Sequence, residues 1–232
     1  FDSIEQSTIK PEAVVVVENS GCSARALPPL TTVPLTVLHE PRNPGYGAAA
    51  NLGVRELPPQ INWVVVCNPD IRLEPKTLER LLAAQDSLPR TGLLGPGVLD
   101  SKGEIFPSAR AIPGIRIGVG HALFSKVWPQ NPWTAAYLGN YTGEHPRSVG
   151  WLSGCFVLIN RDVYNAINGF DERFFMFFED VDLGMRIKKA GHRNVYVPEA
   201  RVTHSGAHST SAHEKKMLLA HHKSAEIFLG KL

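Results

Sequence analysis

NWVVVCNPD, residues 62–70, joins an apolar run to a turn that ends in a carboxylate. The run Trp63–Cys67 is uninterrupted, which is typical of a strand buried on both faces of a parallel sheet. Asp70 then follows the carboxyl end of that strand. In open α/β sheets ligands bind in the crevice outside these ends, where a carboxylate can hold a hard divalent cation. Asn-Pro-Asp is also good turn chemistry, so this stretch alone favours a turn.

Strands and helices alternate on both sides of this run. The sequence predicts further strands at 13–18, 34–39, 92–99, 149–159 and 194–197, and helices near 46–57, 75–87, 161–168 and 180–190. This alternation predicts an α/β fold with a mixed, mostly parallel sheet and helices on both faces. Residues 107–146 break the pattern with Gly, Pro and Trp and are expected to form an irregular lid or insertion, and residues 211–232 a terminal helix with a basic face.

The composition limits the class of protein. A chain of 232 residues with 43% hydrophobic content can form one domain with a substantial core. The 24 basic and 22 acidic residues leave a net charge of +2, which does not indicate a nucleic-acid partner. Cys22, Cys67 and Cys155 are odd in number and widely spaced, which argues against a disulfide framework or a zinc knuckle and favours a reducing compartment. No run approaches the length of a membrane span.

A second group of carboxylates follows an aromatic run in GFDERFFMFFEDVDLG, residues 169–184. Each buried aromatic side chain contributes about 1.5–3 kcal/mol, so this run must pack inward and hold the next residues on a rigid base. Asp180 then lies in the first turn of a helix, as a candidate general base or as a cap. Asp182 is expected to pair with Arg186 one turn on.

Gly45, Gly47 and Ala50 also match a dinucleotide-binding fingerprint. They lie between a predicted strand and a predicted helix, and Asp70 follows about 20 residues later, as that fingerprint requires. An NAD-dependent oxidoreductase is therefore an alternative. The stiff PRNP segment before the glycines and the complete strand unit upstream argue against it.

Five ordered motifs resemble those of the inverting family 2 glycosyltransferases of GT-A fold, in their rhamnosyltransferase-like branch. They are VVVVENSG (14–21), NPGYGAAANLG (43–53), NPD (68–70), the stretch 150–191 and VTHSGAHST (202–210). Together they span nearly all of the chain. The resemblance implies one GT-A domain over 1–232, with a nucleotide-sugar half at 1–105 and an acceptor half with the terminal helix at 106–232.

The resemblance also implies roles for individual residues. It makes Asp180 the catalytic base with Glu179 beside it, and Asp70 and His204 the ligands of Mg²⁺ or Mn²⁺. The donor nucleotide would contact Glu18, Asn19, Asn43, Gly45, Tyr46, Gly47, Asn51 and Asn68. The acceptor would contact Trp151, Ser153, Gly154 and Arg110. A buried strand is the alternative for Trp151, and a solvated loop position for Arg110.

In function, the resemblance implies transfer of L-rhamnose from dTDP-rhamnose to a hydroxyl of a sugar on polyprenyl diphosphate, in cell-wall or surface polysaccharide synthesis. Another donor, such as a galactofuranosyl nucleotide, and a catalytically inactive binding module are alternatives. A lipid-linked acceptor implies a cytoplasmic enzyme that is peripheral on the inner face of the cell membrane. Residues 211–232 mix lysines and histidines with apolar residues, so they can lie on an anionic bilayer or dock on the sheet.

Two departures from the family pattern matter. Asn68 occupies the first position of the metal-binding D-x-D motif, so one anionic ligand is missing and the metal would bind more weakly or depend on His204. The family's first strand has no counterpart before Phe1. The chain is therefore expected to start inside the domain, with a vacant strand position beside residues 13–18 or another element filling it.

Overall fold

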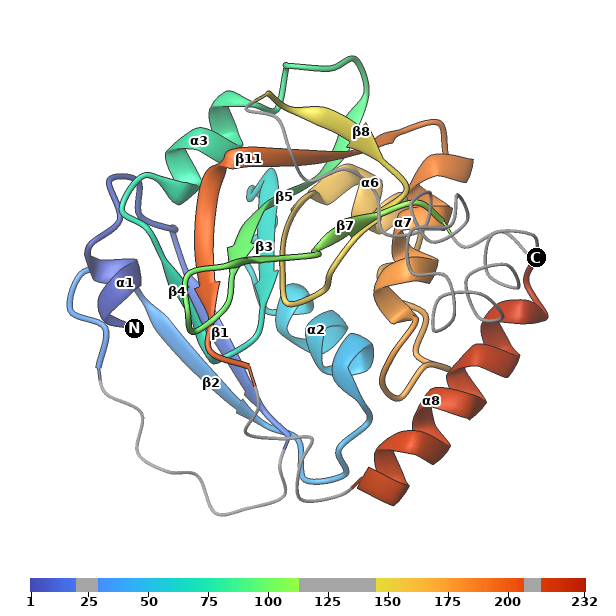
Figure 1. The fold of residues 1–232 in the computed structure, drawn as a ribbon. Coiled ribbons are helices and arrows are strands. Elements are labelled where there is room, and N and C mark those ends of the chain that lie inside the picture. The colour runs from blue at the N-terminus through green and yellow to red at the C-terminus, as the bar shows by residue number, and fades with distance from the viewer. Residues whose placement is uncertain (20–28, 113–144, 207–213) are drawn as a thin grey trace.

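The computed structural model describes residues 1–19, 29–112, 145–206 and 214–232. Figure 1 shows strands crossing the middle of the molecule with helices around them, which confirms the expected mixed α/β class. The helices are α1 (Asp2–Glu5), α2 (Tyr46–Arg55), α3 (Thr77–Ala83), α6 (Arg161–Ala166), α7 (Glu179–Lys189) and α8 (Glu214–Leu229). The strands are β1 (Val14–Glu18), β2 (Leu35–His39), β3 (Trp63–Cys67), β4 (Ile71–Leu73), β5 (Thr91–Leu99), β6 (Ile105–Phe106), β7 (Ala109–Arg110), β8 (Arg147–Val149), β9 (Trp151–Leu152), β10 (Phe156–Asn160) and β11 (Arg193–His204).

A seven-stranded sheet forms the centre, in the order β3-β10-β5-β11-β4, with β6 paired to β5 and β8 paired to β11. Strands β5 and β11 run parallel, and β1 and β2 form a separate parallel pair. The other pairs in the described residues are antiparallel, including both neighbours of β10. The sheet is mixed, as expected, but antiparallel pairing is more frequent in it than the alternation of elements predicts.

The strand expected at 149–159 is divided into several pieces. It starts in β8, continues as β9, turns at Ser153, Gly154 and Cys155, and resumes as β10. Gly150 permits this path, since a Cβ there would lie 2.2 Å from the backbone nitrogen of Ile112. β10 runs antiparallel to both of its neighbours, β3 and β5, a direction that no run of apolar residues encodes. The expected insertion at 107–146 lies mostly outside the described residues.

Two layers of core side chains show that helices cover both faces of the sheet. Along β10, Phe156 and Leu158 pack with α3, whereas Val157 and Ile159 pack with α2, α6 and α7. This alternation follows from the period of two along a strand. The faces therefore bury separate apolar clusters, and α7 is fixed on the second one through Leu183 and Ile187, which are both buried.

The sheet edges near β1 and β3 bear on the expected vacant strand position. In the described part of the chain, β1 pairs with β2 and β3 pairs with β10, and each leaves its other edge without a strand partner. The missing first strand itself stays a prediction, as does where the domain begins. Among the described helices, none has the length and apolar character needed to cross a bilayer.

Candidate active site

A strained turn presents the two neighbouring carboxylates at the start of α7. Phe174 is fully buried and anchors the aromatic loop, which we define as residues 170–178. Phe177 and Phe178 then adopt left-handed backbone conformations, with φ of 69° and 65°. Phe178 is the N-cap of α7 and makes no side-chain capping bond. The helix therefore opens with Glu179 and Asp180, as the sequence predicts, on a backbone that aromatic residues rarely adopt.

Asp180 is held by backbone donors. Its Oδ2 accepts a hydrogen bond from the N–H of Gly154 at 2.9 Å, and its Oδ1 accepts one from the N–H of Val181 at 2.8 Å. The hydroxyl of Tyr46 donates to the carbonyl of Gly154 at 2.5 Å. Tyr46 in α2, the turn after β9 and the first turn of α7 therefore form one hydrogen-bonded group. Each carboxylate oxygen keeps capacity for another donor, such as an acceptor hydroxyl.

Burial perturbs both carboxyls. It raises the pKa of Asp180, while the Gly154 and Val181 N–H groups and the Arg110 guanidinium act in the opposite direction. Burial, and then the charge of Asp180, raise the pKa of Glu179. The Oε2 atom of Glu179 is buried and has no hydrogen-bond partner among the described residues. The pair therefore carries its first negative charge better on Asp180, which has the donors to stabilise it.

The second cluster is at the carboxyl ends of β3 and β11. The Nε2 atom of His204 lies 3.2 Å from Oδ1 of Asp70 and 3.3 Å from Nδ2 of Asn68. A cavity of about 320 Å³ lies beside Asp70 and is lined in part by Pro69, Arg72 and Thr203. One carboxylate, one imidazole and one amide suit a hard or borderline divalent cation that also keeps phosphate oxygens or water. Within the described residues, no three His, Cys, Asp or Glu side chains converge.

The turn after β9 links the two clusters. The N–H of Asn68 donates to the carbonyl of Cys155 at 2.9 Å, and the N–H of the preceding residue, Gly154, donates to Asp180. Burial first, and then the charges of both Asp180 and Asp70, raise the pKa of the Cys155 thiol to about 11. The turn after β9 therefore contacts the candidate base through Gly154 and the end of β3 that carries Asn68 through Cys155.

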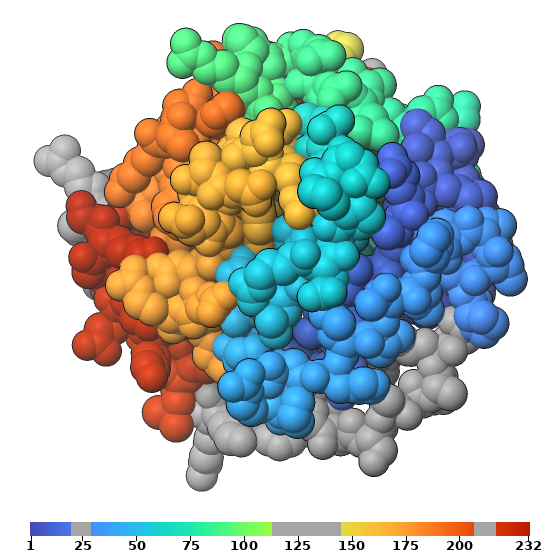
Figure 2. Space-filling view, turned by 180° about the vertical axis from the view of Figure 1, so that it is seen from behind, coloured from blue at the N-terminus to red at the C-terminus, as the bar shows by residue number. Residues whose placement is uncertain are grey.

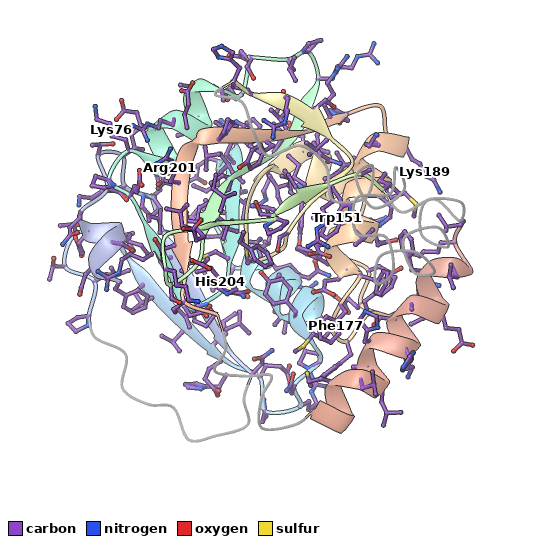
Figure 3. The ribbon with its side chains drawn as sticks, viewed as in Figure 1. Lys76, Trp151, Phe177, Lys189, Arg201 and His204 are labelled. Atoms are coloured by element: carbon purple, nitrogen blue, oxygen red, sulfur yellow. The ribbon has the colours of Figure 1, made fainter. Side chains whose placement is uncertain are left out.

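Arg110 and Trp151, which are expected to contact the acceptor, lie side by side. Their strands β7 and β9 pair in register, and the guanidinium carbon of Arg110 lies 5.7 Å from the centroid of the indole. Trp151 is only 8% exposed, and its Nε1 donates to the carbonyl of Ala111 at 3.0 Å. Figure 3 shows Trp151 in the interior, between the strands and α7. Trp151 belongs to a buried apolar cluster with Val181, Met185 and Phe228, so little of the indole is open for stacking on a sugar. Its contact with the acceptor stays a prediction.

The residues expected to bind the donor divide into two groups. Glu18 lies at the carboxyl end of β1, with Asn19 next to it, and Asn43 is exposed before α2. Gly45 and Gly47 instead contact the aromatic loop: a Cβ on Gly45 would lie 2.3 Å from the Phe175 carbonyl, and one on Gly47 would lie 2.8 Å from the Cβ of Phe170. These glycines therefore dock α2 on the aromatic loop.

Asn51 is placed differently from the expectation. It is buried, and its Nδ2 donates to the carbonyl of Phe170 at 2.9 Å and to Glu172 at 3.0 Å. Its Oδ1 accepts from the N–H of Phe170 at 2.9 Å and from the Tyr164 hydroxyl. The amide is thus fully used in binding α2 to the aromatic loop, and it has no donor or acceptor left for a nucleotide. A cavity of about 620 Å³, lined in part by Asn51 and Arg161, lies on this side of the loop and away from Asp180.

Comparisons with known proteins decide the family. The family model for "Glycosyltransferase like family 2" matches residues 2–219. The chain belongs to this family. N-acetylglucosaminyl-diphospho-decaprenol L-rhamnosyltransferase of Mycobacterium tuberculosis H37Rv is 40% identical over 238 aligned residues, covering 98% of this chain and 78% of the relative. Rhamnosyltransferase WbbL of Escherichia coli K12 is 35% identical over 83 residues, covering 36% of this chain and 31% of the relative.

Solved structures agree in fold. Residues 1–349 of Staphylococcus aureus TarS match with a TM-score of 0.55 at 16% identity, over 88% of this chain and 55% of that one. GalNAc-T7, solved with UDP, GalNAc and Mn²⁺, matches with a TM-score of 0.52 at 14% identity, over 75% of this chain and 33% of that one. The GT-A fold is thereby confirmed. The protein is a glycosyltransferase, so the oxidoreductase alternative drawn from Gly45, Gly47 and Ala50 is wrong.

Several residues around the site of this glycosyltransferase escape sequence analysis. Asp182 pairs with Arg186 at 2.6 Å, as expected, but it also binds Lys231 near the end of the described chain. Ser224 of α8 donates to the carbonyl of Met176 at 2.8 Å. A lysine and a serine in an amphipathic tail carry no signal of such contacts, because their partners lie far away in the sequence.

Proposed function

We propose that this glycosyltransferase transfers L-rhamnose from dTDP-rhamnose to a hydroxyl of a sugar linked to polyprenyl diphosphate. The observation that supports the proposal most is the 40% identity to the mycobacterial L-rhamnosyltransferase over 98% of the chain. An alignment of that extent includes both carboxylate clusters. The proposal places the enzyme in the synthesis of a cell-wall or surface polysaccharide.

The carboxylate pair supports an inverting displacement. Ionised Asp180 takes the proton of the acceptor hydroxyl while the oxygen of that hydroxyl forms a bond to the anomeric carbon. The bond from that carbon to the diphosphate breaks, and its electron pair leaves with the nucleoside diphosphate. A positioned base of this kind contributes about 10²–10⁴ in rate. Glu179, with its unpartnered Oε2, orients the acceptor.

Asp70, His204 and Asn68 are the residues that would hold a divalent cation, Mg²⁺ or Mn²⁺. Their convergence within 3.2–3.3 Å of the His204 Nε2 atom supports the assignment. When bound, such a cation supplies charge neutralisation for the leaving diphosphate. The cavity beside Asp70 and the end of β1 with Glu18 and Asn19 fit the donor side, so residues 1–105 form the donor half and 106–232 the acceptor half.

The outer face of α8 supports a location at a membrane surface. We define this face as Leu218, Leu219, His222, Lys223, Glu226 and Leu229, all of which are exposed. Three exposed leucines suit a bilayer interface, which accepts apolar side chains. Lys223 can contact anionic headgroups, while the carboxylate of Glu226 on the same face offsets its charge. We therefore place the enzyme on the cytoplasmic face of the membrane that carries its lipid-linked acceptor. The side chains of residues 211–216 lie outside the described set.

The test is a transfer assay with purified protein against a panel of nucleotide sugars. N-acetylglucosaminyl diphosphate on a polyprenyl chain serves as the acceptor, and Asp180→Asn serves as the inactive reference. Transfer from dTDP-rhamnose that exceeds transfer from a galactofuranosyl nucleotide supports the proposal. Preferred use of another donor overturns the choice of rhamnose, and absence of transfer from every donor favours a binding module.

A further inference from the structure

The strained turn before Glu179 requires support from other parts of the molecule. A non-glycine residue in the left-handed region costs of the order of 1–3 kcal/mol, and it persists only where the surroundings hold it. Phe177 and Phe178 are consecutive and both left-handed. Their backbone conformation sets the direction of the first turn of α7. The contacts that hold Phe177 and Phe178 therefore also fix the position of Asp180.

Helix α8 supplies that support. The ring of His221 lies 5.4 Å from the ring of Phe177 and 5.3 Å from that of Phe178, between centroids. Phe228 is buried and lies 5.5 Å from the ring of Phe178. Figure 1 shows α8 along one edge of the molecule, next to the segment that leads into α7, and Figure 2 shows the same contact from behind. Figure 3 shows Phe177 on the side of the molecule where α8 lies.

An ion cluster lies beyond the end of α8, beneath the same loop. The Nζ atom of Lys231 lies 2.6 Å from Oδ2 of Asp171 and also binds Oδ1 of Asp182. It lies 5.0 Å from the centroid of the Phe174 ring. The side chain of Asp182 is completely buried, that of Lys231 is 18% exposed, and the other oxygen of Asp182 binds Arg186. The cluster thus joins the start of the aromatic loop, its central phenylalanine and the first turn of α7 through one ammonium.

We propose that Lys231 is a positioning residue: it holds the aromatic loop and the first turn of α7 together, so that the Phe177–Phe178 turn presents Asp180 to the acceptor. The inference rests on the proposed role of Asp180 as the base. The alternative is that Lys231 forms an ordinary buried ion pair, which stabilises the fold as a whole and does not position Asp180. The two differ in what the loss of the ammonium changes: local order and turnover in the first case, global stability alone in the second.

The charge of Lys231 can be removed with little change of volume. Lys231→Met keeps an unbranched side chain over Phe174 but leaves Asp171 and Asp182 without their shared cation. Asp171 retains Arg173 at 2.6 Å and Asp182 retains Arg186, so both carboxylates keep one partner. The fold is therefore expected to survive while the loop loses its link to α7. A misplacement of about 1 Å at a reacting group can cost about 10²-fold in rate.

The experiment compares Lys231→Met with Lys231→Arg, which restores the cation, and with Lys189→Met, which removes an exposed cation near the end of α7. Full-length variants are examined by hydrogen–deuterium exchange and by transfer from dTDP-rhamnose. We expect exchange at residues 174–182 to rise at least about tenfold in Lys231→Met and to stay unchanged in β3 and β5. We expect kcat to fall at least about tenfold with little change in the dissociation constant for dTDP. Lys231→Arg should restore most of the exchange protection and most of kcat. Lys189→Met should match the parent protein in both measurements.

Equal exchange and kcat in Lys231→Met and Lys189→Met would overturn the inference. A uniform rise in exchange across the sheet would also overturn it, in favour of global stabilisation. If Lys231→Met does not fold, Lys231→Gln, which removes the charge and keeps a hydrogen-bond donor, takes its place with the same expectations. Near-normal turnover of Asp180→Asn would refute the proposed base, whereas the exchange result tests the link to the loop without reference to substrate.

Discussion

The backbone N–H of Gly154 lies 2.9 Å from Oδ2 of Asp180, which ties the turn between β9 and β10 to the first turn of α7. The approach is close, because a Cβ on Gly154 would lie 3.3 Å from the Cβ of Asp180 and 3.4 Å from the Tyr46 ring, so a side chain there would require these neighbours to shift slightly. It also places a donor where negative charge must be held. Asp180 is thus both partly buried and able to ionise, which a general base requires.

Asp180→Asn tests this base directly. The amide keeps the shape of the side chain and removes its basicity, so we expect kcat to fall by at least about 10² while donor affinity changes little. The measurement is steady-state transfer together with titration of the donor nucleotide. Asp162→Asn, an exposed aspartate in the first turn of α6, is the matched control. Turnover close to that of the control would move the base elsewhere.

Glu179→Gln tests the buried carboxyl through the pH dependence of stability. Burial and the charge of Asp180 raise the pKa of Glu179 in the folded state. The folded protein therefore keeps a proton that the unfolded chain has already released, and stability falls as the pH rises from the ordinary pKa through the raised one. Glutamine has no such titration, so the Tm advantage of Glu179→Gln should grow between pH 5 and pH 9. A difference that is independent of pH would show that Glu179 titrates normally.

Local patterns predicted the parts of the site that lie within one element. Asp180 in the first turn of α7 and the pair Asp182–Arg186 follow from helix periodicity. Asp70 does follow a strand, but the expectation of a strand buried on both faces of a parallel sheet is wrong, because β3 is a half-buried edge strand that pairs antiparallel with β10. Asn51 was assigned to the donor from its motif, but its partners at Phe170 and Glu172 are brought to it by tertiary packing. Lys231 illustrates the same limit, since neither propensity nor spacing pairs a residue of the tail with Asp171.

Removal of the cation, and substitution of the residues proposed to bind it, test the second cluster. EDTA should abolish activity, and Mg²⁺ or Mn²⁺ should restore it. Asp70→Ala should weaken binding of the donor in the presence of Mn²⁺, with the exposed Asp86→Ala as control. Asn68→Asp adds a carboxylate beside His204, so we expect the Mn²⁺ concentration for half-maximal activity to fall about tenfold. Full activity in chelator would exclude a required metal.

Asn51→Ala tests the reassignment of this residue from the donor site to the scaffold. The change leaves the N–H and carbonyl of Phe170 and the hydroxyl of Tyr164 without their partner in a buried site. Each orphaned group costs about 1–3 kcal/mol, so the free energy of unfolding should fall by about 2–5 kcal/mol in denaturant titration. Asn165→Ala, an exposed amide on α6, should change it by less than about 0.5 kcal/mol. Unchanged stability with weakened nucleotide binding would return Asn51 to the donor site.

The last prediction concerns the outer face of α8. Leu218, Leu219 and Leu229 are 58%, 70% and 61% exposed, while Ser224 and Phe228 of the same helix are buried against the rest of the protein. Insertion of a leucine into a bilayer interface stabilises binding by up to about 1.5–3 kcal/mol. Vesicles with anionic lipid should therefore co-sediment the protein at low salt, and high salt should weaken binding because it screens the lysine and the headgroups.

The double variant Leu218→Ser/Leu219→Ser should reduce vesicle binding at least about tenfold, since two apolar anchors are lost. Its transfer to a lipid-linked acceptor in vesicles should fall in parallel, while transfer to a soluble analogue of the acceptor should not change. Ile105→Ser is the control, because Ile105 is 53% exposed on β6 and lies outside the outer face of α8. Vesicle binding that survives in the double variant, or equal transfer to soluble and lipid-linked acceptors by the parent protein, would show that this face does not bring the enzyme to a membrane.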